Sequence, residues 1–279
     1  MRAMQLVSAS KLKRTQVKLL RSREVMQFLD DLLQRVLAAS ADLSHPLCVS
    51  RKEGPCALVL FTSDAGLSGS YNTRLIQLAE AHLRRDSLSP TQLYFIGKKG
   101  YRYFTKRGFA ATQAYTDLAG RFEPKKTLPI AQDLMDRFLS GKLAAIEFLY
   151  CRFVSAAVYH PTIVSWLPIQ FSRQHVADST QKISNQRSTI SEPTEYIFEP
   201  SPQAIFEDLL PRWAMAKFQC ILLEAFTSEH SARMIAMKNA TENAQEILKT
   251  LTMQRNKIRQ ASITKELSEI VGTAEALKE

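Results

Sequence analysis

Residues 212–271 read RWAMAKFQCILLEAFTSEHSARMIAMKNATENAQEILKTLTMQRNKIRQASITKELSEIV, sixty residues without a glycine or a proline. Because these two residues are the main helix breakers, the run predicts one continuous α-helix. At a rise of about 1.5 Å per residue this helix would be roughly 90 Å long, whereas helices in globular domains average about 11–12 residues. Most of it must therefore project from any domain or enter a partner.

The N-terminal region predicts a second long helix that can pack on the first. Residues 1–44 also lack glycine and proline, and apolar residues recur there at helical spacing. We expect this helix to end near Ala39, because Pro46 cannot continue it. A long helix without packing is only marginally stable in water. The two terminal helices are therefore predicted to form an intramolecular antiparallel coiled coil.

The C-terminal helix carries a weak heptad seam for this pairing. Its members alternate spacings of three and four: Met237, Ala240, Ala244, Ile247, Leu251, Gln254, Ile258 and Ala261. Three alanines and a glutamine stand where leucines would bury more apolar area, which disfavours a dimeric zipper. Since the C-terminal helix is the longer one, its far end should be a single helix. The apolar residues there, Ile263, Leu267, Ile270 and Val271, predict a socket on a partner.

Between the terminal helices the pattern changes and indicates an α/β domain. We expect strands at 57–62, 92–96, 112–118, 145–155 and 162–171, helices at 72–85, 98–107 and 128–139, a polar loop at 173–194 and an edge strand at 196–199. Alternating strands and helices predict a largely parallel sheet, with the last two long strands as a hairpin. The fold class is thus α/β: an antiparallel coiled coil of N- and C-terminal helices with an inserted Rossmann-like α/β domain. The predicted divisions are 1–44, 45–205 and 206–279.

Charge and cysteine content narrow the functional classes. The net charge of +10, from 37 basic and 27 acidic residues, favours an acidic protein, a nucleic acid or a membrane surface as partner. Residues 1–24 hold seven basic residues and one acidic, and residues 233–265 hold seven and two. No apolar run approaches the roughly 20 residues that cross a bilayer. The four cysteines lack metal or redox spacing, which indicates reduced thiols.

Three segments resemble the gamma subunit of F-type ATP synthases. AMQLVSASKLKR, residues 3–14, is similar to that family's first-helix motif, and SDAGLSGSYN, residues 63–72, is similar to its internal turn. FTSEHSARMIAMKNATENAQEILKTLTMQRNKIRQASITKELSEIVGTAEAL, residues 226–277, resembles its C-terminal signature nearly position for position. The resemblance follows the whole chain in order, and the C-terminal segment is its most specific part.

The resemblance implies a rotor shaft with no catalytic residue, cofactor or metal of its own. In this family the coiled coil stands inside a ring of alpha and beta subunits, and the α/β domain sits beside the epsilon subunit and on the membrane c-ring. Rotation of the c-ring turns the shaft and couples proton transport to ATP synthesis or hydrolysis. We therefore expect a peripheral position at the cytoplasmic face of the bacterial plasma membrane, with the matrix side of the mitochondrial inner membrane as the alternative. The choice between proton and sodium belongs to the membrane subunits.

Individual residues match positions that the family uses. The resemblance places upper contacts with beta at Arg259, Gln260, Thr264 and Glu266, a contact near an acidic beta loop at Met4, lower coil contacts at Lys11, Met237 and Lys238, and a structural turn at Asp64, Gly66, Gly69 and Asn72. Packing within the coiled coil is an equally good interpretation of Met4 and Met237. Asn72 would be a helix cap. Family members usually begin upstream of the 3–14 motif. Either the true start lies upstream of Met1, or the N-terminal helix is short and leaves more of the C-terminal helix unpaired.

Two other functions remain as alternatives. A basic helical rod could be a nucleic-acid-binding arm, although it lacks interleaved aromatic residues and no zinc or helix-turn-helix spacing accompanies it. Gly66 and Gly69 follow a predicted strand as in phosphate-binding loops, but their spacing matches neither common phosphate-loop motif. His230 has no partner at metal-ligand spacing, so we expect it on the surface. We therefore predict neither a nucleic-acid partner nor an active site.

Overall fold

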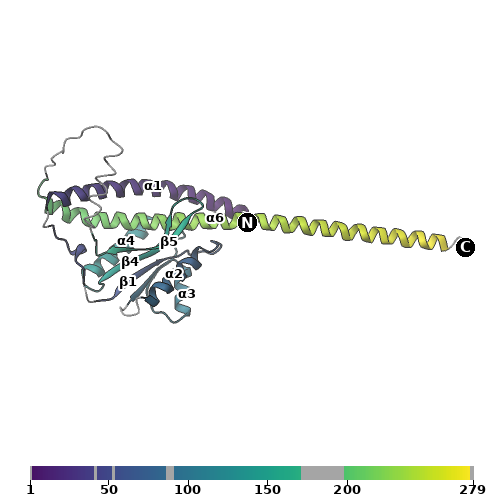
Figure 1. Cartoon of the computed structure of the whole chain (residues 1–279), viewed down its shortest axis with the longest axis horizontal. Coiled ribbons are helices and arrows are strands. Elements are labelled where there is room, and N and C mark those ends of the chain that lie inside the picture. The colour runs from purple at the N-terminus through teal and green to yellow at the C-terminus, as the bar shows by residue number, and fades with distance from the viewer. Residues whose placement is uncertain (1, 41–42, 52–53, 86–90, 171–197, 277–279) are drawn as a thin grey trace, which may run out of the picture.

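Two long helices lie side by side, and the α/β domain packs against one side of the pair (Figure 1). The computed structural model describes residues 2–40, 43–51, 54–85, 91–170 and 198–276. Helix α1 spans Arg2–Ala39 and helix α6 spans Pro202–Ala276, which are 38 and 75 residues long. Helix α6 continues alone well beyond the start of α1 (Figure 1). The predicted architecture of two terminal helices with an inserted α/β domain is confirmed.

Helix α6 begins ten residues before the glycine- and proline-free run. It passes through Pro211, which we expected to precede the helix, so that expectation is wrong. A proline inside a helix removes one backbone hydrogen bond and costs about 3 kcal/mol. Here the same turns bury Phe206, Leu210 and Ala214, each at most 1% exposed. Burial of these side chains against the domain offsets the cost of the proline.

The sheet has five strands in the order β3-β2-β1-β4-β5. They are β1 (Cys56–Phe61), β2 (Thr91–Ile96), β3 (Ala111–Tyr115), β4 (Ala145–Phe153) and β5 (Tyr159–Leu167). The first four strands run parallel, and β5 pairs antiparallel with β4. This confirms a largely parallel sheet with a hairpin at its edge. The hairpin turn is shorter than expected, because Pro161 already belongs to β5.

Three helices and one short 3-10 helix complete the domain. They are α2 (Tyr71–Arg85), α3 (Lys98–Lys106), α4 (Pro124–Leu139) and η1 (Pro46–Cys48). Helix α4 begins four residues earlier than predicted, because Pro124 in its first turn has the backbone angle that a helix start requires. The predicted loop at 173–194 lies outside the described residues. Of the predicted strand at 196–199, only residues 198 and 199 are described, and they are not in a strand.

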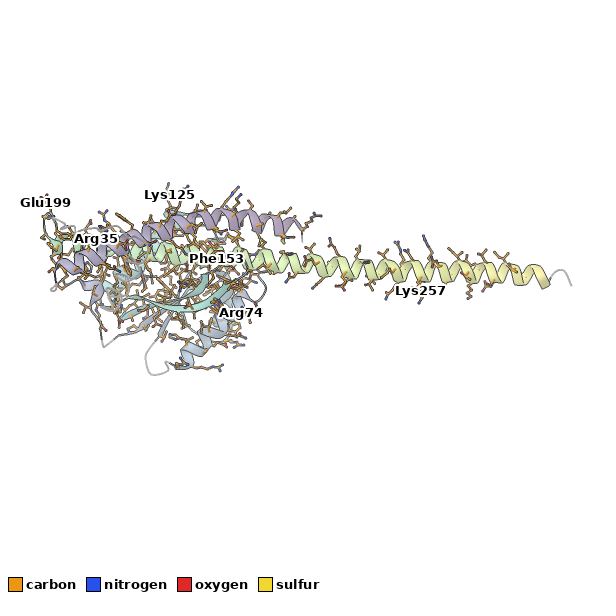
Figure 2. The ribbon with its side chains drawn as sticks, turned by 45° about the horizontal axis from the view of Figure 1, so that its top comes forward. Arg35, Arg74, Lys125, Phe153, Glu199 and Lys257 are labelled. Carbon is orange, nitrogen blue, oxygen red and sulfur yellow. The ribbon has the colours of Figure 1, made fainter. Side chains whose placement is uncertain are left out.

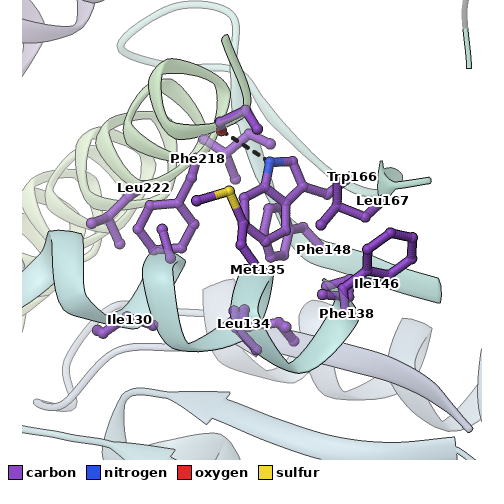
Figure 3. Packing of buried hydrophobic residues seen from close by; sticks show 14 of the residues in the cluster. Ile130, Leu134, Met135, Phe138, Ile146, Phe148, Trp166, Leu167, Phe218 and Leu222 are labelled. Carbon is purple, nitrogen blue, oxygen red and sulfur yellow. Dashed lines mark hydrogen bonds between the residues drawn. The ribbon is translucent and has the colours of Figure 1, made fainter. Parts of the chain in front are cut away.

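Each face of the sheet has its own apolar core. On one face Leu60, Phe95 and Phe104 pack with residues of α2. On the other, an aromatic cluster joins the sheet to α4 and α6 (Figure 3). In that cluster Phe148 stacks on Trp166 with ring centroids 4.8 Å apart, and Phe218 of α6 packs against both rings. The indole nitrogen of Trp166 donates to the Ala214 carbonyl at 3.0 Å.

The seam of the coiled coil on α1 differs from a simple apolar stripe. Its buried residues are Ser8, Leu12, Thr15, Leu19, Met26, Leu33 and Val36. These follow heptad spacing, but small hydroxyl side chains fill two of the positions. Val7, Val25 and Phe28 lie on the exposed face instead, at 56%, 54% and 62% exposure. Ser8 and Thr15 bury less apolar area than leucine would at these positions.

Replacing Phe218 by alanine should destabilise the protein strongly, because the cavity would open between the sheet and α6. We expect a loss of about 3–5 kcal/mol in the free energy of unfolding, measured by urea denaturation. Phe28→Ala, on the exposed face of α1, is the matched control and should cost less than about 1 kcal/mol. Equal losses in the two variants would contradict this account of the core.

Candidate functional site

The C-terminal half of α6 is a bare rod. From Glu242 to Thr273 every residue except Asn256 is exposed, a length of about 48 Å at the usual helical rise. The side chains of this segment, such as that of Lys257, project from a helix that no other described element covers (Figure 2). The described part of the molecule thus offers this segment no packing partner of its own.

The heptad seam predicted on α6 is mostly not a seam within this chain. Met237 is 4% exposed and Ala240 is half-buried. The remaining members, Ala244, Ile247, Leu251, Gln254, Ile258 and Ala261, are exposed. Their assignment to the intramolecular coiled coil is therefore wrong, because the N-terminal end of α1 lies near Ala240 of α6 and the helix pair ends there. The expectation of a single helix at the far end is confirmed. The unpaired part of α6 is longer than predicted, because the predicted seam extended to Ala261.

The predicted upper contact residues all lie on this bare rod. Arg259, Gln260, Thr264 and Glu266 are exposed. The Thr264 hydroxyl donates to the Gln260 carbonyl at 2.9 Å within the helix. These four side chains are near one another because they are at neighbouring positions of one helix. Their role in binding beta stays a prediction.

The other predicted contact residues lie where the helix pair ends. Met4 is 52% exposed, Lys11 is half-buried, and Met237 is buried. Lys238 is exposed, with its Nζ 3.8 Å from Glu242 Oε1. Packing within the coiled coil therefore describes Met237 but not Met4.

Large apolar side chains are spread around most of the circumference of the rod. The exposed ones, at 49–70% exposure, are Ile247, Leu248, Leu251, Met253, Ile258, Ile263, Leu267, Ile270 and Val271. Successive residues of a helix turn by about 100°, so these positions point in different directions around the axis. Such exposed apolar area marks an interaction surface. A socket that encloses the rod fits this distribution better than a partner on one face.

Five polar side chains in the middle of α6 connect it to the sheet domain. We call Ser228, Glu229, His230, Ser231 and Arg233 the polar collar. The first four are at most 3% exposed, and the Arg233 side chain is 14% exposed. Buried polar groups are costly unless they are hydrogen-bonded, so their partners decide what this segment does.

The collar binds backbone carbonyls at four separate places in the domain. Ser228 Oγ donates to Cys151 O at 2.9 Å, and the Ser231 hydroxyl donates to Ala156 O in the β4–β5 turn. His230 Nε2 lies 2.9 Å from Gly120 O. Arg233 donates from Nε to Gly66 O at 3.1 Å and from Nη2 to Ala65 O at 3.2 Å. Glu229 Oε1 accepts from Arg233 Nη2 at 2.7 Å.

The predicted turn supplies the carbonyls that Arg233 binds. Asp64 holds the turn in place, because its carboxylate accepts from the backbone nitrogens of Lys98, Asp117 and Ala119 at 3.1, 3.3 and 2.7 Å. One carboxylate thus links the ends of β1, β2 and β3. Gly69 has a φ of +57°, in the region that favours glycine.

Asn72 does not cap α2 as predicted, because it already lies inside the helix, after Tyr71. Its side chain instead accepts from Ser63 N at 3.0 Å and donates to Ser68 Oγ at 3.0 Å. It therefore holds together the loop between β1 and α2.

This arrangement fills the place where α/β proteins commonly bind ligands. In such folds the binding crevice lies at the carboxyl ends of the parallel strands. Here the loops that follow β1, β3 and β4 all contact the collar of α6. The carbonyls of the turn that contains Gly66 and Gly69 accept from the guanidinium of Arg233, which is a cation. That contact does not resemble a cradle for phosphate, which needs free backbone N–H donors.

His230 is fully buried, at 0% exposure, so its predicted position on the surface is wrong. Because Gly120 O can only accept, Nε2 carries the proton of the neutral ring, and the buried Nδ1 has no partner among the described residues. Burial lowers the pKa of His230 to about 4, although the bond to Gly120 acts in the opposite direction. Burial also raises the pKa of Glu229, and Arg233 opposes that effect.

The chain matches the protein family described as ATP synthase over residues 1–277. It is 38% identical to the ATP synthase gamma chain of Symbiobacterium thermophilum over 279 residues, covering 99% of this chain and 92% of that one. The gamma chain of Moorella thermoacetica is 36% identical over 277 residues, covering 99% and 93%.

Solved structures show the same fold. A chain of the Tetrahymena thermophila mitochondrial ATP synthase, from its central stalk and c-ring, superposes with a TM-score of 0.59 at 19% identity, covering 86% of this chain and 98% of that one. A chain of the Euglena gracilis mitochondrial ATP synthase gives 0.56 at 16% identity, covering 99% and 95%. A bare helical rod on an α/β domain, in a chain with these relatives, is a subunit of an ATP synthase. The chain belongs to the ATP synthase gamma-chain family, and the predicted resemblance is confirmed.

Gly120→Ala should disturb the contact between the domain and α6. Gly120 has a φ of +65°, and an added Cβ would lie 2.7 Å from His230 Cε1. We expect a loss of about 2–4 kcal/mol in the free energy of unfolding, measured by urea denaturation. Gly108→Ala is the control, because Gly108 has a φ of +83° with open space around it. Gly108→Ala should lose only the cost of a positive φ, about 1–2 kcal/mol in the free energy of unfolding. An equal loss in the two variants would argue against a clash between the added Cβ and His230.

The buried histidine should make stability depend on pH. The pKa of His230 is about 4 in the folded chain against an ordinary 6.5, so the unfolded chain binds more protons between these values. His230 therefore contributes stability above about pH 6.5, and this contribution is lost as the pH falls toward 4. The loss is on the order of 3 kcal/mol.

The measurement compares urea unfolding of the wild type and His230→Gln at pH 7 and at about pH 4.5. The wild type should lose more stability than the variant, since glutamine cannot titrate. Glu229 is present in both proteins, so its opposite contribution cancels in the comparison. Parallel pH profiles would show that His230 does not stay neutral in the folded chain.

Proposed function

We propose that this chain is the non-catalytic central shaft of an F-type ATP synthase. In this role it transmits rotation from the membrane c-ring to the catalytic ring of alpha and beta subunits, and so couples proton transport to ATP synthesis or hydrolysis. One observation carries the proposal: a single 75-residue helix is fixed to a domain at its middle and is bare over the half that follows.

A shaft must hold its angle relative to the part that drives it, and the polar collar suits that task. Apolar contacts are non-directional, whereas hydrogen bonds weaken steeply when they are misaligned. The collar bonds reach carbonyls at four places in the domain. A rotation of the domain about α6 would therefore break several bonds at once and leave buried polar groups unpaired.

The bare rod supports a partner that encloses it and moves relative to it. Its large apolar residues face about two thirds of the circumference, and its cations, such as Arg255, Lys257 and Arg259, are exposed. Attraction between these cations and acidic loops of beta would be long-ranged and tolerant of angle. Different faces of the rod would favour different conformations of beta, which is how one partner shifts the equilibrium of another. In this role Arg259, Gln260, Thr264 and Glu266 form the upper contacts with beta, and Met4 lies near an acidic beta loop. Lys11, Met237 and Lys238 belong to the lower coil contacts.

The inserted domain would be the foot of the shaft, beside the epsilon subunit and on the c-ring. Among the described residues no helix is long and apolar enough to cross a membrane. The chain would thus reach the membrane through the complex, at the cytoplasmic face of a bacterial plasma membrane. Its relatives in Symbiobacterium thermophilum and Moorella thermoacetica support the bacterial alternative over the mitochondrial one.

The shaft explains the structure better than the two alternative functions. A phosphate-binding enzyme needs an accessible crevice at the carboxyl ends of the strands, and α6 lies there. A nucleic-acid-binding arm would not need large apolar residues around most of the rod, because phosphate contacts come from cations and polar groups.

Mixing the chain with purified alpha and beta subunits should yield a complex with one copy of this chain per six partners. Arg259→Ala with Gln260→Ala should weaken co-elution or ATPase activity by roughly tenfold, as expected for the loss of hydrogen bonds to a charged group. The isolated double variant should unfold at the same urea concentration as the wild type, because both residues are exposed.

Lys125→Ala with Gln132→Ala is the matched control, since it removes the same kinds of group from the exposed face of α4. It should leave assembly and activity unchanged. If the wild-type chain failed to co-elute with alpha and beta, the proposed function would be wrong. If both double variants had equal effects, the assigned upper contacts would be wrong instead.

A further inference from the structure

A basic hollow lies between the coiled coil and the edge of the sheet. It has a volume of about 570 Å³ and is lined by Arg23 of α1 and by six residues of the β4–β5 hairpin: Arg152, Phe153, Val154, His160, Pro161 and Thr162. Phe153, one of these lining residues, lies where the domain meets the two helices (Figure 2). The hollow is distinct from the polar collar, because none of its lining residues belongs to α6.

The lining of the hollow gathers cationic and donor groups without an acidic residue. Arg152 and His160 are directly opposite each other in the antiparallel register of β4 and β5, so their side chains emerge on the same face of the hairpin. Both residues are exposed. No hydrogen bond or ion pair joins Arg152 to any residue that the structure describes. The Arg152 guanidinium and the His160 imidazole can therefore both donate to one anion.

Arg23 approaches the same hollow from the helix side and is held firmly in place. Its Nε donates to Glu224 Oε1 at 3.1 Å, and its Nη2 donates to Phe153 O at 2.7 Å. Nη1 is not used in these bonds. The Glu224 carboxylate is 8% exposed, and it lies on the α6 side of Arg23, outside the hollow. Arg23 is thereby pre-organised, which lowers the entropic cost of binding a ligand.

We propose that this hollow is a binding site for a phosphate oxyanion, either inorganic phosphate or the phosphoryl group of a nucleotide. Arg23, Arg152, His160 and Thr162 offer donors from three separate elements. The oxygens of a tetrahedral phosphate point in several directions and can accept from donors on all three elements, whereas the two oxygens of a carboxylate lie in one plane. Arginine forks match phosphate geometry and form strong charge-assisted bonds. A bound phosphate would bridge α1 to the β4–β5 hairpin.

The test is calorimetric titration of the full chain with inorganic phosphate at low salt, alongside Arg152→Gln. We expect saturable binding near the millimolar range that weakens at least about tenfold in Arg152→Gln, as for the loss of a hydrogen bond to a charged group. Arg102→Gln is the matched control, because Arg102 is an exposed arginine on α3, and it should leave binding unchanged. Bound phosphate should also raise the melting temperature of the wild type.

A second titration with ADP distinguishes the two sources of the ligand. Tighter binding of ADP than of phosphate, with the same dependence on Arg152, would identify a nucleotide phosphoryl group as the ligand. Equal or weaker binding of ADP would identify inorganic phosphate. The proposal is overturned if phosphate and ADP both fail to bind at about 20 mM, far above the expected dissociation constant. It is also overturned if Arg152→Gln and Arg102→Gln weaken binding equally, since this would mean non-specific attraction to a basic protein.

Discussion

The hydrogen bonds from the polar collar of α6 to backbone carbonyls of the α/β domain are the interaction on which the structure depends. Each contributes only about 1 kcal/mol net, but leaving one of these buried groups unpaired costs about 1–3 kcal/mol. The bonds reach the loops after β1, β3 and β4. Asp64 ties the first three strand ends together. The domain and the helix therefore behave as one body with a defined angle between them.

Helix α6 divides into three segments with different chemistry. Its first turns bury apolar residues such as Phe206 and Phe218 in the core. The collar follows, where directional bonds replace apolar packing. Beyond Ala240 none of the described residues outside α6 covers the helix. Along the sequence, apolar packing first fixes the helix to the domain, the collar then sets its angle, and the last segment is exposed. A shaft that transmits rotation to a partner requires this order.

Much of the fold could be predicted from the sequence, because strand and helix patterns in the inserted domain are regular. The start of α6 could not be predicted, since proline normally stops a helix. Pro211 does not stop α6 because the same turns bury Leu210 and Ala214, and only the structure shows this burial. His230 was misplaced because a polar helical residue is most often exposed. Ser228 and Ser231 give a signal in the sequence: such poor helix formers inside a long helix can have side chains with tertiary partners, here Cys151 O and Ala156 O. The contact residues of the rod could not be identified from the physics of this chain alone, because their contacts are with a partner subunit.

The apolar rod has a consequence for the life of the chain before it is assembled. Nine large apolar side chains are exposed on a helix segment that no other described element covers. Exposed surface of this kind promotes aggregation and recognition by chaperones and proteases. Copies made in excess of their socket should therefore be removed. The amount of this chain in a cell would then be set by the supply of its partners, so that a mechanical feature also controls the stoichiometry of assembly.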